Sequence, residues 1–177
     1  AWKQQLIVKS TLSIEDSRET YLGLTGADFE ATPLRRYSAT ALDRMQANRL
    51  SVSARWSAQP APWLTLTADA YRHAFDRAWN RLDHFRRGPE LYSLLVQPVR
   101  GGLDGQFLQV LRGAADSTGP DDALVVQRNS RTFISEGVQL SARSTFSTGP
   151  ISHEVEAGAR FHHDEIRRDH TGQSYAM

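Results

Sequence analysis

WKQQLIVKSTLSI, residues 2–14, alternates apolar and polar side chains along most of its length. Successive side chains of a β-strand point to opposite faces, so this pattern predicts a strand with one apolar and one polar face. Gln4, Ile7 and Ser10 are the exceptions. The even positions hold most of the apolar side chains: Trp2, Leu6, Val8, Leu12 and Ile14.

Four later segments repeat the alternation, and they are residues 49–57, 64–70, 135–146 and 154–162. The longer ones run for about nine or more residues, the length that a tilted strand needs to cross a bilayer. Strands of soluble proteins average about five or six residues. The alternative is a soluble antiparallel sheet with one face on a core and the other in water.

The connections between these segments alternate in length. Tight turns are expected at Gln59–Pro62 and Ser147–Pro150, whereas loops of about thirty and about fifty residues separate the other segments. Short periplasmic turns and long extracellular loops are typical of outer-membrane barrels. The long loop is expected to contain short helices at residues 90–96 and 106–114. Aromatic residues then fall at two levels, as interfacial girdles require: Trp2, Trp56, Trp63 and Phe146 at the turn side, and Phe75, Trp79 and Phe161 towards the loops.

Composition narrows the class of protein. The chain has 177 residues, a formal net charge of +1 and no cysteine, and its mean hydropathy is negative. No apolar run is long enough for a transmembrane helix. The balanced charge argues against a nucleic-acid partner, and the absence of cysteine excludes disulfides and thiolate metal sites.

The predicted fold is therefore all-β: an antiparallel transmembrane β-barrel, present here as about five strands. Residues 1–177 start inside a patterned segment without a signal peptide. Five strands with such loops cannot close, and lipid does not tolerate open sheet edges. We therefore expect the whole range to be a partial barrel domain, with the remaining strands and any plug domain elsewhere in the protein.

Three stretches resemble a known family. They are ETYLGLTGADF at 19–29, followed by Pro33, Arg36-Tyr37 and LDRM at 42–45; AYRHAFDR at 70–77; and GPISHEVEAGARF at 149–161. In this order they resemble TonB-dependent outer-membrane receptors, and most closely the ferric citrate receptor type.

The resemblance implies a plugged barrel in the outer membrane of a Gram-negative bacterium. Such a receptor binds an iron chelate, ferric citrate or a siderophore, and imports it with energy from the TonB complex. Its expected partners are the chelate, the TonB complex through regions outside this sequence, and outer-membrane lipid and lipopolysaccharide. It is not an enzyme and needs no cofactor. A passive porin is the alternative.

An anionic chelate calls for guanidinium groups, which bind carboxylates through paired hydrogen bonds. Strand parity and direction select residues that face the barrel interior near its outer mouth, and the first long loop adds an arginine pair. The candidate substrate-binding residues are Arg35, Arg36, Arg49, His73, Arg77, Arg131, Arg160 and His162. The alternative is that interior charges pair with one another. Arg55 and Arg143 also face inward, but near the turn side, where pairing with the plug is expected.

Two chemical patterns fall short of a site. His162-His163-Asp164-Glu165 resembles a metal-binding run, but alternation leaves only one His–carboxylate pair on each face. No metal site and no catalytic residue are therefore expected. His73 with Asp69 or Asp76 is the faint candidate for a barrel enzyme.

Overall fold

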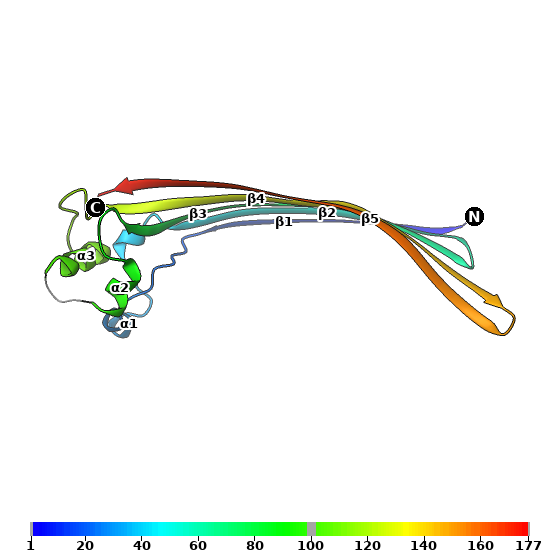
Figure 1. The fold of residues 1–177 in the computed structure, drawn as a ribbon, viewed down its shortest axis with the longest axis horizontal. Coiled ribbons are helices and arrows are strands. Elements are labelled where there is room, and N and C mark those ends of the chain that lie inside the picture. The colour runs from blue at the N-terminus through cyan, green and yellow to red at the C-terminus, as the bar shows by residue number, and fades with distance from the viewer. Residues whose placement is uncertain (1, 99–101, 177) are drawn as a thin grey trace. The chain divides into compact units, whose positions relative to one another are not determined.

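The computed structural model describes residues 2–98 and 102–176. Five strands form one antiparallel sheet whose strand order follows the chain, β1-β2-β3-β4-β5 (Figure 1). The chain is therefore all-β in class, and the sheet is not closed. Within the described residues, no helix is both long and apolar enough to cross a membrane. The strands are β1 (Lys3–Ser17), β2 (Arg44–Ala61), β3 (Leu64–Phe85), β4 (Leu124–Thr148) and β5 (Ile151–Tyr175).

The strands extend further towards the two long loops than the alternation predicts. Alternation ends near residue 70 in β3 and begins near residue 135 in β4, yet the ladder includes Phe85 and Leu124. Beyond those points both faces carry a mixture of apolar and polar side chains, so the alternation ends while backbone hydrogen bonding continues. The two long connections are correspondingly shorter than predicted, at residues 18–43 and 86–123.

Both tight turns join neighbouring strands, but the first lies later than predicted. Gln59 and Pro60 belong to β2, and the turn is Pro62-Trp63. The second turn, Gly149-Pro150, lies inside the predicted stretch. Gly149 has a φ of +60°, a left-handed conformation that glycine adopts without steric cost.

The chain divides into two compact units, and every strand has a part in each. Unit 1 comprises Ala1–Ile14, Ala47–Asp76 and Arg131–Arg167, and unit 2 comprises Glu15–Gln46, Arg77–Ser130 and Arg168–Met177.

Unit 1 is a single sheet layer. Among its described residues, the buried apolar side chains are only Ala47 and Ala58. One face of this sheet, here called the apolar face, is made of uncovered aliphatic and aromatic side chains, with Phe161 73% exposed. Other exposed members are Leu6, Val8, Leu12, Ile14, Leu50, Val52, Val138, Leu140 and Val155. The opposite side is called the polar face.

Unit 2 has a conventional hydrophobic core. Its helices are α1 (Gly26–Ala31), the 3-10 helix η1 (Ser38–Thr40), α2 (Leu91–Val96) and α3 (Gly102–Arg112). Helix α2 agrees with the prediction, α3 starts earlier than predicted, and α1 and η1 were not predicted. Apolar side chains from the helices pack on the strand ends, with Val110, Leu111 and Leu124 fully buried. The remaining core members are Tyr37, Ala39, Leu82, Phe85, Leu91 and Leu94.

Candidate functional site

A polar cluster occupies the polar face of unit 1. The Tyr71 hydroxyl lies 2.5 Å from Nδ1 of His162 and accepts a hydrogen bond of 2.9 Å from Nη2 of Arg160. Nε2 of His162 lies 2.7 Å from the Asp164 carboxylate. Of the predicted residues, Arg160 and His162 are thus brought into direct contact, while Tyr71 was not predicted. The sequence did not identify Tyr71 as a site residue, because a tyrosine in an alternating strand fits either face equally well.

Gly137 makes this cluster possible. Tyr71 is in β3 and His162 in β5, with β4 between them, and strands two places apart are separated by about 9–10 Å. A Cβ at Gly137 of β4 would lie 2.8 Å from the Tyr71 hydroxyl and 2.6 Å from the Phe161 carbonyl oxygen. The glycine therefore provides the space through which the tyrosine reaches across one strand.

A cavity of about 410 Å³ opens beside the cluster on the same face. Its cationic side chains are Lys9, Arg55 and Arg160, and Asp69 is its one acidic side chain. Nε of Arg55 donates to Asp69 at 2.6 Å. Lys9 and Arg160 are therefore the cations that no carboxylate pairs with inside the cavity. The remaining lining residues are Ile7, Ser53, Ala54, Ala70, Tyr71 and Gln139.

His73 lies at the border of the cluster. Its ring centroid is 5.4 Å from that of Tyr71, and the side chain is exposed. Among the described residues, His73 makes no hydrogen bond or ion pair with Asp69 or Asp76. The Asp76 carboxylate instead accepts a hydrogen bond of 2.6 Å from Thr132.

Charges on the polar face also pair locally, as the alternative interpretation requires. Arg55 bonds Asp69 and Arg143 bonds Glu154, the latter through Nε at 2.9 Å. These partners lie within the sheet itself. Arg160 differs because its contacts are with Tyr71 and His162 and not with a carboxylate.

The other predicted strand residues are placed separately from the cluster. The Arg49 guanidinium stacks over the Phe75 ring, 4.8 Å from its centroid, which is a cation–π contact. Arg131 is partly exposed in β4. Arg77 belongs to unit 2, where its Nε is buried and has no hydrogen-bond partner among the described residues.

The loop arginines have structural contacts in unit 2. Arg36 donates to the carbonyl oxygens of Arg18 at 2.6 Å and Asp43 at 3.2 Å, and to both oxygens of Thr40. Arg35 lies 3.4 Å from the Asp28 carboxylate. Arg36 thus stabilises the backbone of the loop, because its N–H groups donate to oxygen atoms of the loop itself.

Asp28 ties this loop to the second long connection. It accepts hydrogen bonds from Tyr37 at 2.5 Å and from Arg112 at 2.8 Å, in addition to Arg35. Burial by itself raises the pKa of the carboxyl group, but the hydrogen bonds from Tyr37, Arg112 and Thr25 outweigh burial and leave its pKa below the ordinary value.

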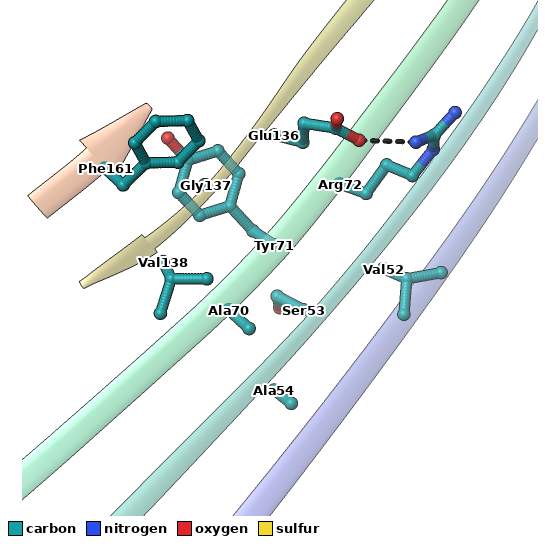
Figure 2. Close-up of a pocket in the computed structure, with 10 residues that line it drawn as sticks. All are labelled: Val52, Ser53, Ala54, Ala70, Tyr71, Arg72, Glu136, Gly137, Val138 and Phe161. Carbon is teal, nitrogen blue, oxygen red and sulfur yellow. Dashed lines mark hydrogen bonds and ion pairs between the residues drawn. The ribbon is translucent and has the colours of Figure 1, made fainter. Parts of the chain in front are cut away.

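The apolar face has a hollow of about 450 Å³ (Figure 2). Small side chains, Ala54 and Ala70, form its floor between Val52, Val138 and Phe161. Figure 2 shows the ion pair of Arg72 with Glu136 at its edge. These two residues interrupt the apolar pattern in sequence, and in the structure they neutralise each other.

Metal binding receives no geometric support from the described part of the chain. His162 contacts Asp164, whereas His163 lies 3.9 Å from Glu136, and alternation places the two pairs on opposite faces. No group of three or more metal-ligating side chains occurs among the residues that the structure describes.

No protein-family model matches the chain, and no curated protein matches it in sequence.

Proposed function

We propose that the chain forms part of a β-barrel receptor in the outer membrane of a Gram-negative bacterium, which binds an anionic iron chelate and imports it with TonB-delivered energy. In this proposal, the unit 1 parts of the strands cross the membrane. The polar face lines the interior, and lipid and lipopolysaccharide cover the apolar face. The chelate is ferric citrate or a carboxylate siderophore.

The uncovered apolar face is the observation that supports a membrane location. Soluble domains bury the apolar side of a sheet against a second layer, and exposed apolar patches rarely exceed a few hundred Å². Unit 1 has no such layer, and side chains such as Leu12 and Phe161 are 67% and 73% exposed. Contact with lipid removes the free-energy cost of exposing these apolar side chains to water.

The open edges support a larger closed sheet. β1 and β5 are the two ends of the strand order, so each has one side without a strand partner in the described residues. Within lipid, each unpaired backbone N–H or C=O group costs roughly several kcal/mol. Closure of the sheet into a barrel avoids this cost. Further strands of the same protein are the proposed partners of both edges.

The polar cluster supports an anionic ligand. Lys9 and Arg160 are cations of the polar-face cavity without a carboxylate partner there, and the Tyr71 hydroxyl adds a neutral hydrogen-bonding group. Guanidinium and ammonium groups in this arrangement favour carboxylate oxygens of a chelate.

Uptake of labelled ferric citrate by cells tests the proposal as a whole. Cells that express the full protein should accumulate iron, and removal of TonB should abolish the accumulation. Uptake that persists without TonB would instead establish a passive channel. Equal uptake with and without the protein would exclude transport of this chelate, and a panel of ferric siderophores then completes the test.

A matched pair of variants tests the polar cluster. Arg160→Gln removes a cation at the cavity, and Arg143→Gln removes one on the same face outside it. We expect the first to raise the KM for uptake about tenfold, the effect of losing a charge-assisted hydrogen bond. Arg143→Gln should leave the KM unchanged. Equal effects of the two variants would contradict the assignment.

A further inference from the structure

Unit 2 contains a second polar cavity, with a volume of about 610 Å³. The first long connection and strands β2–β5 supply the residues that line it. Three arginines give it a cationic character, and none of them was among the predicted binding residues: Arg18, Arg44 and Arg128. Its neutral polar side chains are Asn80, Thr171, Gln173, Ser174 and Tyr175.

The three guanidinium groups differ in how they are engaged. Arg44 is paired with Asp16, through Nε at 2.6 Å and a second contact. Arg128 has only neutral partners, with its Nε 3.2 Å from Ser130 and its Nη1 3.5 Å from Asn80. Arg18 interacts electrostatically with the same Asp16 carboxylate, so Arg18 and Arg44 share one acidic partner. Three positive charges and the one negative charge of Asp16 therefore leave a net charge of +2 at this cavity.

The one acidic residue of the lining does not neutralise them. The Asp43 side chain is almost fully buried and turns to Thr20, which donates at 2.7 Å, and to the Leu82 N–H, which donates at 2.6 Å. Both carboxylate oxygens are thus engaged below the surface. The net character of the exposed lining is cationic.

The cavity wall is held in place by hydrogen bonds between separate segments. Arg36 bridges the carbonyl oxygens of Arg18 and Asp43, and the Tyr175 hydroxyl donates to the Ala39 carbonyl oxygen at 2.6 Å. These bonds connect the end of β1, the loop before β2 and the end of β5. The wall is therefore fixed before any ligand arrives, which reduces the entropic cost of binding.

We infer that this cavity is a binding site for a phosphate group, carried by a soluble ligand or by a lipid headgroup. Three guanidinium groups, from the first long connection, β2 and β4, approach one space. A phosphate has enough oxygen atoms to accept from all of them at once. A carboxylate, with two oxygens, can satisfy fewer. A phosphate dianion also matches the net charge of +2 that the three arginines and Asp16 leave at the cavity. This inference concerns unit 2 and does not depend on the transport proposal.

Arginine-specific labelling of the full chain with phenylglyoxal tests the site residue by residue. Inorganic phosphate should slow the labelling of Arg18 and Arg128, whereas Arg86 and Arg87, exposed in the same unit outside the cavity, should label at an unchanged rate. Sodium chloride at matched ionic strength serves as the screening control. This comparison uses only the unmodified protein, so it does not depend on the folding of a variant.

Variants then measure the contribution of the charges. The double substitution Arg18→Gln with Arg128→Gln should weaken phosphate binding, followed by phosphorus NMR, at least about tenfold. Arg86→Gln with Arg87→Gln removes the same charge from the same unit and should leave binding unchanged. An equal loss of phosphate binding in both double variants would overturn the inference, because net charge alone would then explain the binding.

Vesicles separate the two sources of phosphate. Phosphatidylcholine vesicles with added phosphatidic acid should protect Arg18 and Arg128 if the ligand is a headgroup, and phosphatidylcholine alone should not. Protection by either free phosphate or these vesicles supports the site and identifies the source. Protection by neither, or equal protection by citrate, would overturn it.

Discussion

The Tyr71 hydroxyl and Nδ1 of His162 lie 2.5 Å apart although a complete strand separates their backbones. Gly137 occupies the crossing point in that intervening strand and leaves room for the tyrosine. The contact connects β3 with β5 directly. It also positions the Arg160 guanidinium, which donates to the same hydroxyl.

Gly137→Ala should displace Tyr71. The added methyl group would lie 2.8 Å from the Tyr71 hydroxyl and 2.6 Å from a backbone oxygen, and overpacking of this kind costs about 1–3 kcal/mol. Loss of the Tyr71–His162 cross-peak in an NMR spectrum measures the displacement. Gly172→Ala is the control, because its methyl group would meet only Val125, at 4.0 Å. A retained cross-peak in Gly137→Ala would refute the crossing role.

Leu140→Arg should impair insertion into lipid bilayers. Leu140 is 54% exposed on the apolar face, and arginine on the lipid side of a barrel costs about 2–4 kcal/mol at the bilayer midplane. Gln139→Arg places the same charge on the next residue of β4, which faces the polar cavity, and should have little effect. Co-flotation of each variant with vesicles measures insertion. Equal insertion of both variants would argue against lipid contact at this face.

Asp43→Ala should loosen the attachment of the first long connection to β3. It leaves the Leu82 N–H and the Thr20 hydroxyl without their partner, at a cost of about 1–3 kcal/mol for a buried donor. Asp43→Asn retains an oxygen acceptor for Leu82 and should lose less. Hydrogen exchange at the Leu82 amide is the measurement, and equal exchange rates in the two variants would contradict the hydrogen-bond explanation.

Asp43 also predicts a pH dependence. Burial is the largest influence and raises the pKa of this carboxyl group above its ordinary value, despite the hydrogen bonds that it accepts. Its protonated form is therefore favoured in the folded state, so the stability contribution is present at low pH and is lost as pH rises through the folded pKa. The stability of Asp43→Asn should lack this decline. Thermal unfolding across a pH series compares the two, and parallel curves would contradict the prediction.

For Asp122 we expect the opposite pH dependence of stability. The backbone N–H groups of Thr118 and Gly119 donate to its carboxylate at 2.7 and 2.9 Å and hold its pKa below the ordinary value. Its contribution is present above the unfolded pKa of about 3.9 and is lost as pH falls through the folded value. Limited proteolysis of the 117–122 turn should therefore accelerate in acid. In Asp122→Ala it should be fast at every pH, and a persisting acid dependence would assign the effect elsewhere.

The strands were predictable because every second side chain along them is apolar. Residues 2–14 become part of β1, and the period of two identifies its faces without any tertiary information. The same rule missed residues 71–85, because apolar side chains such as Phe75 and Leu82 occur on both faces there and the alternation is lost. Helix α1 was missed for a different reason: it has six residues, and its Thr25 cap and Asp28 contacts depend on the distant Arg112.

The site was predictable only in part. Charge and parity identified Arg160 and His162, since an arginine on a polar face is conspicuous in sequence. Predicting Tyr71 and Gly137 would have required the register of three neighbouring strands. The register determines which residues lie opposite one another, and the sequence of a single strand does not contain it. Arg36 was selected by its charge, but its contacts with four loop oxygens follow from a loop conformation that composition does not specify.

The strand order has a consequence for how the protein folds. Because each strand pairs with its immediate predecessor along the chain, the sheet can grow by the successive addition of hairpins, and no strand has to wait for a distant segment to be synthesised. The tight turns close quickly, whereas closing the connections at 18–43 and 86–123 carries a larger entropic cost. We therefore expect β2–β3 and β4–β5 to form first as separate hairpins and the two long connections to set the rate at which they join.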